Sequence, residues 1–367
     1  MRGVLAKVSC LLQILRVNFF LLALLLVAPL FGDLQETLDA QVEKNGTPGM
    51  AVIIFDQDKI ISELYSGVRE AGKRALLEKG DLWHIGSDGK AMTATLMARL
   101  VEKGLAKWDS PLSEIFPKES KKFHLDASAI TIEQLLSHTA GLPANVDREL
   151  FNEGRKLGAK RIEKQRLEVV KVMLKDAPAS EPGSKYLYSN TGYVIAGAVI
   201  EKLLDTPYEK AIVKEVFGPL GMKSAGFGAP EGKSPRGHVV RGGRRSATPT
   251  GYEGDNPAIY APAGGMYFSL EDWAKFGQAH LKGEGILKPE TFAKLHKVIL
   301  NDYGLGWLVR EKDGKAVRLG HDGTNTMWRA RITLDLEMGR GVCVVANDND
   351  DATVKGVGAV EKEGLRQ

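Results

Sequence analysis

The spacing of apolar residues changes twice along this chain of 367 residues. Near the N-terminus, two short segments on either side of a turn at residues 56–58 are typical of a strand hairpin, and after residue 303 the pattern takes a period of two, which is also typical of strands. Between these regions apolar residues recur every three or four positions, which predicts helices. Strands are predicted at Gly49–Asp56, Ile60–Tyr65, Tyr303–Arg310, Ala316–Leu319, Met327–Leu336 and Gly341–Asn347. Helices are predicted at Leu34–Lys44, Ser87–Gly104, Ile132–Ser137, Arg161–Leu174, Asn190–Leu204, Tyr208–Phe217, Ser269–Leu281, Pro289–Leu300 and Asp351–Glu363.

This order of elements predicts an α+β fold. Strands from both ends of the chain are expected to form one antiparallel sheet flanked by the first and last helices, with a mostly helical lobe inserted between them. The α/β lobe then comprises residues 33–104 and 236–367, and the helical lobe comprises residues 105–235. The stretch 226–265, rich in glycine and proline, is expected to be a long irregular crossing. The helix that begins near residue 87 starts where the lobes meet, which is a usual place for a pocket.

Residues 1–32 have the composition of an export signal. Residues 1–18 carry basic but no acidic side chains, and the run 19–31 is apolar throughout. This run fits the core of a signal peptide and is shorter than a membrane span. The chain is therefore expected to be exported, to the periplasm or the medium, with residues 33–367 as the folded part. Because Leu30 makes a poor cleavage site, the alternative is an N-terminal anchor, with membrane attachment through residues 17–32.

Composition narrows the range of partners. The chain has 50 basic and 46 acidic residues, and most of the difference lies in the leader, so no nucleic-acid partner is expected. The cluster Arg241, Arg244 and Arg245 is expected to lie in a solvated loop. Cys343 lies in an apolar run and is expected to be a buried hydrophobic residue without a disulfide partner. The seven histidines show no metal-ligand spacing, so neither a metal nor another cofactor is expected.

The tetrapeptide Ser87-Asp88-Gly89-Lys90 is the strongest candidate for chemistry. It opens a predicted helix, so Ser87 and Lys90 share a helical face. The amine can then hold or take the proton of the hydroxyl, and the helix N-terminus stabilises negative charge on oxygen. The alternative is an exposed helix start with a serine cap and a solvated lysine. Taken alone, the tetrapeptide is better explained by this alternative than by chemistry.

A second motif, Tyr188-Ser189-Asn190, also precedes a predicted helix. Beside Lys90, the tyrosine can be a phenolate or shuttle a proton, because a neighbouring ammonium lowers the pKa of a phenol. Asn190 can donate a hydrogen bond to a substrate carbonyl. Serine and asparagine are also good helix caps, which explains the motif without chemistry.

A third motif, Gly320-His321-Asp322-Gly323-Thr324, lies between two predicted strands. A histidine followed by glycine on an edge strand can bind a substrate carboxylate while the backbone passes close to the scissile carbonyl. A hairpin turn of the Asp-Gly type explains the same residues. Taken singly, this motif too is better explained by structure than by chemistry.

Together, the three motifs have the order and spacing of the serine β-lactamase and penicillin-binding protein superfamily. The chain resembles its class C β-lactamase-like branch, which includes D-Ala-D-Ala carboxypeptidases, D-aminopeptidases and esterases. The resemblance covers residues 34–350 and implies a β-lactamase/transpeptidase-like fold. Other segments similar to that branch are 130–142, 181–183, 219–222, 262–265, 269–272 and 303–307.

The resemblance implies a role for each matching residue. Ser87 is the nucleophile that becomes acylated, and Lys90 and Tyr188 activate it and later protonate the leaving group. The backbone N–H groups of Ser87 and Thr324 form the oxyanion hole. The implied reaction is acyl transfer through an acyl-enzyme that water resolves, without a metal. The implied substrate-binding residues are Asn190, His321, Gly323 and Thr324.

Two positions depart from the pattern of the relatives. His321 stands where many of them have lysine, and a histidine is mostly uncharged at neutral pH. This favours an esterase or a peptidase over a dedicated β-lactamase. Asp88 places a carboxylate next to the nucleophile, where it is expected to raise the pKa of Lys90 and weaken the activation of Ser87.

The leading hypothesis is therefore an exported serine hydrolase acting on a small-molecule or peptide substrate, namely an ester, an amide or a D-amino-acid-containing peptide. The alternative is a catalytically inactive relative that binds peptidoglycan-like or peptide ligands, which the unusual pair Asp88-Gly89 suggests. Binding alone does not need Ser87, Lys90 and Tyr188 together, which favours the enzyme. Substrate choice is expected to depend on the loops 144–179 and 229–261.

Overall fold

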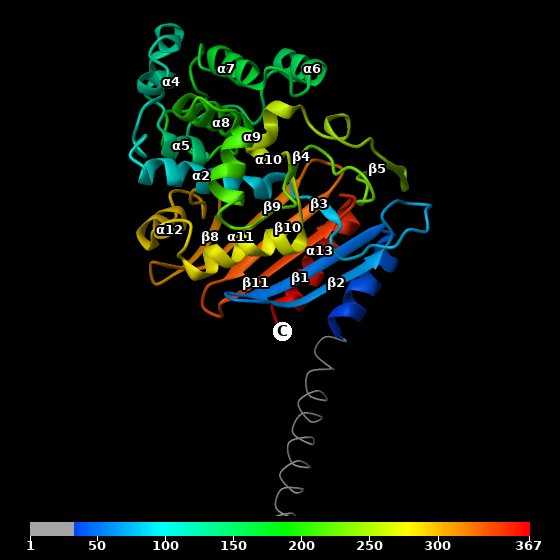
Figure 1. Ribbon diagram of the computed structural model, residues 1–367. Helices are drawn as coiled ribbons and strands as arrows, with labels where there is room; N and C mark the ends of the chain where they lie inside the picture. The colour runs from blue at the N-terminus through cyan, green and yellow to red at the C-terminus, as the bar shows by residue number, and fades with distance from the viewer. Residues whose placement is uncertain (1–32) are drawn as a thin grey trace, which may run out of the picture.

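The computed structural model describes residues 33–367, and its centre is a six-stranded sheet in the order β2-β1-β11-β10-β9-β8 (Figure 1). All neighbouring strands are antiparallel. Strands from the two ends of the chain meet where β1 pairs with β11, which confirms the predicted sheet. The strands are β1 (Gly49–Asp56), β2 (Ile60–Gly67), β8 (Leu308–Lys312), β9 (Lys315–Thr324), β10 (Arg329–Asp335) and β11 (Arg340–Ala346).

One face of the sheet is covered by the two helices expected there. Residues 33–45 are helical, and α13 (Asp351–Gly364) follows the last strand. Apolar residues of both helices pack against every second residue of β1 and β11, as the alternation along a strand requires. The buried cluster on this face includes Leu34, Leu38, Val52, Ile54, Val342, Val344, Val357 and Val360.

The opposite face carries α11 (Leu270–Lys282), whose helical prediction is confirmed to within one residue at each end (Figure 1). The other set of β1 and β11 side chains, among them Phe55 and Cys343, is buried in the main core on this side. Cys343 is fully buried and has no disulfide partner, as its apolar surroundings predict.

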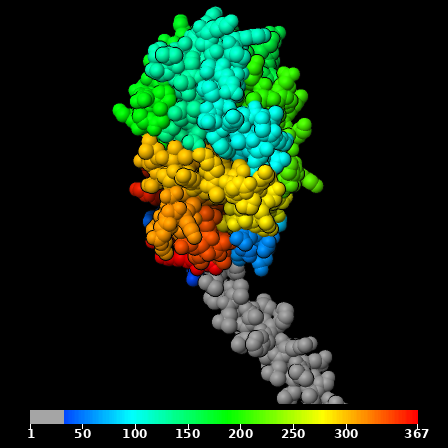
Figure 2. Space-filling model, turned by 90° about the vertical axis from the view of Figure 1, so that its left-hand side faces the viewer, coloured from blue at the N-terminus to red at the C-terminus, as the bar shows by residue number. Residues whose placement is uncertain are grey.

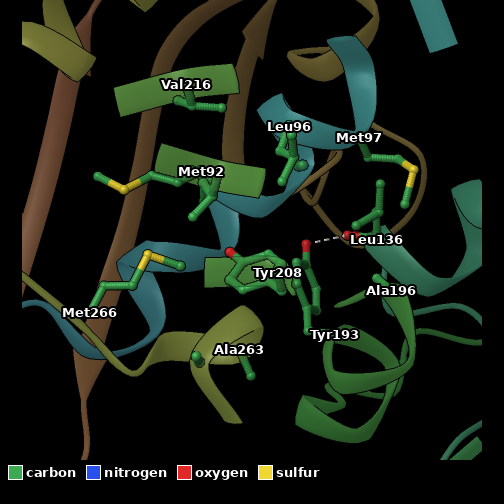
Figure 3. Packing of buried hydrophobic residues seen from close by; sticks show 14 of the residues in the cluster. Met92, Leu96, Met97, Leu136, Tyr193, Ala196, Tyr208, Val216, Ala263 and Met266 are labelled. Atoms are coloured by element: carbon green, nitrogen blue, oxygen red, sulfur yellow. Dashed lines mark hydrogen bonds between the residues drawn. The ribbon is translucent and has the colours of Figure 1, made fainter. Parts of the chain in front are cut away.

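A mostly helical part of the chain lies above the sheet (Figures 1 and 2). The helix α2 (Gly89–Glu102) runs beneath these helices and packs against them through Met92, Leu96 and Met97 (Figure 3). The Tyr193 hydroxyl in the same core donates to the carbonyl of Leu136 at 2.7 Å. The helices of this part are α3 (Leu112–Ile115), α4 (Leu125–Ala129), α5 (Ile132–Leu136), α6 (Arg148–Leu157), α7 (Ile162–Met173), α8 (Asn190–Leu204) and α9 (Tyr208–Ile212), which continues as one π-helical turn over Val213–Phe217.

The segment 226–265 is more regular than its composition suggests. A short sheet joins β3 (Leu82–His84), β7 (Met266–Ser269) and β4 (Gly226–Phe227). A hairpin joins β5 (His238–Arg241) to β6 (Arg244–Ala247) across a Gly-Gly turn, and α10 (Ala261–Gly264) ends the segment. The prediction of a solvated loop is wrong for Arg245, which lies in β6 and pairs with Asp348 and Asp350.

Other boundaries also differ from the predictions. The helix predicted over 289–300 ends early, as α12 (Pro289–Leu295), and α6 was not predicted because its apolar residues are few. The predicted export signal, residues 1–32, lies outside the described residues. Across residues 33–367, no helix is both long enough and apolar enough to cross a membrane.

Candidate active site

Ser87 lies in a 3-10 turn, Gly86–Asp88, that leads directly into α2. Gly86 has a φ of +52°, and a Cβ at this position would lie 2.2 Å from the backbone nitrogen of Thr324. Only glycine combines this backbone conformation with so close an approach. The turn and the end of β9 therefore pack backbone against backbone, which places the N–H of Thr324 beside the nucleophile turn.

The four residues expected to carry the chemistry meet at one point. Lys90 Nζ lies 3.0 Å from Ser87 Oγ and 2.8 Å from Asn190 Oδ1. The Tyr188 hydroxyl donates to Ser87 Oγ at 2.8 Å. Lys90 is fully buried, so the explanation of the tetrapeptide as an exposed helix start with a solvated lysine is wrong.

Burial changes the charge of Lys90. Removal of the amine from water lowers its pKa from the usual 10.5 to about 7, and the neighbouring Asp88 opposes this shift only as a smaller effect. A lysine with this pKa is neutral in a large fraction of molecules at neutral pH. It can therefore accept a proton, which an ordinary ammonium cannot do.

The partners of Lys90 also set the direction of its lone pair. Its Nζ lies 2.6 Å from the carbonyl oxygen of Ala263 and 2.8 Å from Asn190 Oδ1. Both oxygens can only accept hydrogen bonds, so they take the two N–H groups of the neutral amine. The lone pair is then left for the third neighbour, the hydroxyl of Ser87.

Tyr188 is held as a neutral phenol. Although 37% of the residue is exposed, burial raises the pKa of its phenol well above 10, and the hydrogen bond with Ser87 only partly offsets this. The expectation of a resting phenolate is therefore wrong, whereas a proton shuttle is compatible with the geometry. His138 holds this segment in place: its ring lies 4.3 Å from the Tyr188 ring, and its Nδ1 accepts from the N–H of Ser189 at 3.0 Å.

Asp88 is buried close to His321. It is 1% exposed, neither carboxyl oxygen has a hydrogen-bond partner, and its Oδ1 lies 3.6 Å from His321 Nδ1. Burial, together with the nearby Asp322, raises the pKa of Asp88 well above its usual range. As expected, Asp88 raises the pKa of Lys90, but burial of the amine lowers that pKa by more, so Lys90 still acts as a base near neutral pH.

We predict that Asp88→Asn retains activity to within about threefold, because burial of the amine affects the pKa of Lys90 more than Asp88 does. Its pH–rate profile is expected to keep the rising limb of the parent protein near pH 7. The measurement is kcat/KM for an activated ester between pH 5 and 9. A limb that moves down by more than one pH unit would show that the charge of Asp88, and not burial, dominates the pKa of Lys90.

The third motif lies in a strand and not in a hairpin turn. His321 to Thr324 belong to β9, and His321 pairs with Ile332 of β10. A Cβ at Gly323 would lie 1.9 Å from the carbonyl oxygen of Ile85, so this glycine allows β9 to approach the turn that carries Ser87. The structure thus gives Gly323 a packing role.

The His321 side chain does not reach the space in front of Ser87. It is 4% exposed, and its ring nitrogens lie 3.1 Å from the Tyr303 hydroxyl and 3.0 Å from the carbonyl oxygen of Asp322. Burial lowers the pKa of its imidazole to about 3. The expected neutral ring is therefore present, but the ring is not placed to bind a substrate carboxylate.

A cavity of about 70 Å³ opens beside Ser87. Both loops expected to govern substrate choice contribute to it, through Asn145 and Phe151 on one side and Asn256 and Tyr260 on the other. Sequence reasoning did not single out these four residues or the carbonyl of Ala263. For Ala263 a signal existed, since it lies in the matching segment 262–265. Across residues 33–367 no cluster of three or more histidine, cysteine, aspartate or glutamate side chains is arranged to hold a metal ion.

The fold is a β-lactamase/transpeptidase-like fold. The family model described as Beta-lactamase matches residues 34–362, and the chain belongs to this family. The match spans almost all of the described residues and includes every member of the candidate site.

Individual relatives are distant. The Protein flp of Staphylococcus aureus (strain N315) is 24% identical over 89% of this chain, and the aligned part is 66% of its own length, just under two thirds. Among solved structures, the octameric penicillin-binding protein homologue from Pyrococcus abyssi has a TM-score of 0.74 at 24% identity, covering 90% of this chain and 76% of that chain. The D-amino acid amidase from Ochrobactrum anthropi SV3 has a TM-score of 0.74 at 23% identity, and the alignment covers 92% of this chain and 99% of the amidase chain.

Proposed function

We propose that this protein is a serine hydrolase that forms an acyl-enzyme on Ser87 and acts on an ester, an amide or a D-amino-acid-containing peptide. The observation that carries the proposal is the convergence of Lys90 Nζ and the Tyr188 hydroxyl on Ser87 Oγ, at 3.0 Å and 2.8 Å. One group is a base near neutral pH and the other a neutral proton donor. This pairing is what acyl transfer requires.

In the proposed acylation, Ser87 Oγ attacks the substrate carbonyl carbon while its proton moves to the lone pair of Lys90. Negative charge develops on the carbonyl oxygen, which the N–H groups of Ser87 and Thr324 stabilise. The bond to the leaving group then breaks. The proton held by Lys90 passes through the Tyr188 hydroxyl to the leaving oxygen or nitrogen, so the leaving group departs neutral and Lys90 is again an amine.

Deacylation reverses the same roles. Water attacks the ester carbonyl of the acyl-enzyme and gives a proton to Lys90, directly or through Tyr188. The ester bond to Ser87 breaks, and Oγ regains its proton. Asn190, held by Lys90 on one side and by Asn145 Oδ1 at 2.9 Å on the other, is placed to orient the acyl group.

The inactive alternative depended on the unusual pair Asp88-Gly89, and both residues have a structural explanation. Asp88 is buried, and its effect on the pKa of Lys90 is smaller than that of burial. A Cβ at Gly89 would lie 3.3 Å from Met266 Cε and 3.5 Å from Gly264 Cα, so β7 and α10 leave room for only a small residue at the start of α2. Neither residue interferes with the contacts of Ser87, which supports the enzyme over the binding protein.

We also propose that the protein is exported, from the composition of residues 1–32. The folded part would then act on substrates outside the cytoplasm. Whether the leader is removed or kept as an anchor distinguishes a released from a membrane-attached enzyme.

The proposed function is tested by intact-mass measurement of residues 33–367 after incubation with a fluorophosphonate and, separately, with a penicillin. We expect one fluorophosphonate adduct, mapped to Ser87 by peptide mass spectrometry, since a neutral Lys90 activates this serine. A penicillin adduct as well would favour peptidoglycan-type substrates. Folded protein that takes up neither reagent would contradict the hydrolase and favour the binding protein.

A further inference from the structure

Neutral groups alone line the cavity beside Ser87. Its polar side chains are amides and hydroxyls, and its apolar wall is formed by Phe151, Ala263 and two glycines. Within the described part of the chain, no acidic, basic or histidine side chain lines this space. The polar lining residues are Ser87, Asn145, Asn190, Asn256, Tyr260 and Thr324.

Lys90 is the titratable group closest to the cavity, with its Nζ 3.0 Å from Ser87 Oγ, and it is uncharged in the form that activates Ser87. Two other charged side chains near the cavity are paired with groups outside it. Asp255, next to Asn256 in the chain, is 2% exposed and is bonded to His84 at 2.8 Å and Asn325 at 2.7 Å. Arg331 donates to Asp322 at 2.7 Å and to Glu361 of α13 at 2.7 Å, so both carboxylates are paired with this guanidinium.

One exposed cation lies near the rim. The guanidinium of Arg155 on α6 packs on the outside of the Phe151 ring, 5.5 Å from its centre. It is exposed to solvent and does not line the cavity. Any electrostatic contribution from Arg155 is therefore screened by water and salt.

The neutral lining makes the cavity selective. A substrate carboxylate or ammonium that enters it loses water on the side that faces the lining, and no oppositely charged side chain of the lining replaces that water. Neutral amide groups of a substrate can be bound in this cavity, because two lining groups are available to them. The side-chain amide of Asn256 and the Nδ2 of Asn145 make no hydrogen bond within residues 33–367. Each amide can pair with a substrate C=O or N–H group.

We infer that the site is selective for substrates without a charged group next to the scissile bond, namely neutral esters and N-acylated amides. This inference rests on the proposed function. It disfavours carboxypeptidase action, because the C-terminal amino acid that leaves in that reaction carries a free carboxylate beside the scissile bond. It equally disfavours aminopeptidase action, in which the acyl group carries a free ammonium.

Two matched pairs of esters test the inference. The phenyl esters of N-acetyl-D-alanine and of D-alanine differ by an ammonium in the acyl group, at a pH where the amine is protonated. The N-methylamide of O-acetyl-D-lactic acid and the free O-acetyl-D-lactate differ by a carboxylate in the leaving group. We expect kcat/KM, divided by the spontaneous rate of each ester, to favour the neutral member of both pairs by roughly 10- to 100-fold.

Variants of the lining residue Asn256 test whether the neutral lining causes the selectivity. Asn256→Lys is expected to lower the ratio of kcat/KM between the neutral lactic acid amide and O-acetyl-D-lactate by several-fold, because the ammonium pairs with the substrate carboxylate. Asn256→Asp is expected to lower the ratio between N-acetyl-D-alanine phenyl ester and D-alanine phenyl ester by several-fold, because the carboxylate pairs with the substrate ammonium. Arg155→Gln is the control and is expected to leave both ratios unchanged. Equal rates within each pair, or ratios that depend on Arg155, would overturn the inference. Failure to hydrolyse any of the four esters would instead contradict the proposed function.

Discussion

Ser87→Ala is expected to lower kcat/KM for any ester or amide substrate by at least about 10³-fold, because the variant has no oxygen that can be acylated. Lys90, Tyr188 and the two oxyanion-hole N–H groups remain, and they account for whatever residual rate over water is left. The measurement is kcat/KM together with the intact mass after fluorophosphonate treatment. Both signals are expected to disappear together.

A matched variant separates this effect from damage to the fold. Ser184→Ala removes an exposed hydroxyl that bonds only to the carbonyl of Glu181 nearby, and it is expected to retain activity and labelling. Circular dichroism and the thermal midpoint of both variants should remain close to those of the parent. Activity that survives in Ser87→Ala would assign the reaction to another nucleophile.

Activity is expected to rise with pH and to level off above about pH 7, because Lys90 with a pKa of about 7 must lose its proton to act as a base. Below that pH the amine is an ammonium and has no lone pair for Ser87. Lys90→Met is expected to reduce kcat/KM by on the order of 10³-fold. Lys90→Arg should do the same, since a guanidinium keeps its proton throughout this range.

Tyr188→Phe tests which residue is responsible for the rise of kcat/KM with pH, that is, the rising limb of the pH–rate profile. It removes the proton donor to the leaving group but leaves the buried amine, so we expect a lower rate of about 10²- to 10³-fold with the limb still near pH 7. The measurement is kcat/KM from pH 5 to 9 for the parent and all three variants. If the limb vanished in Tyr188→Phe and remained in Lys90→Met, the roles of base and proton shuttle would be reversed.

The elements that depend on local pattern were largely predictable. The sheet built from both ends of the chain follows from short strand-like segments near each end, of which β1 and β11 are nearly continuous apolar runs. The helix α8 begins at Asn190 as predicted, because Ser189 caps it by accepting from the N–H of Gly192. By contrast, α6 was missed, since its burial comes from packing on other segments and not from a run of apolar residues.

In the candidate site, too, contacts between residues close in sequence were predictable, and contacts between distant residues were not. Ser87 and Lys90 are one helical turn apart, so their proximity follows from sequence spacing. The contact between Ser87 and Tyr188 joins residues 101 positions apart, and only the resemblance to a family indicated it. Asn145 and Asn256 come from two loops whose paths depend on long-range contacts, and no local signal marked them.

The sequence by itself thus determined the elements, the sheet from both chain ends and the residue types able to form an acyl-enzyme, because these depend on short-range periodicity and spacing. The tertiary structure alone decided the charge of those residues. Burial makes Lys90 a base near pH 7, keeps Tyr188 a phenol and raises the pKa of Asp88 well above its usual range. Loss of water around a side chain is a property of all the segments packed against it, and a linear sequence does not show which segments those are.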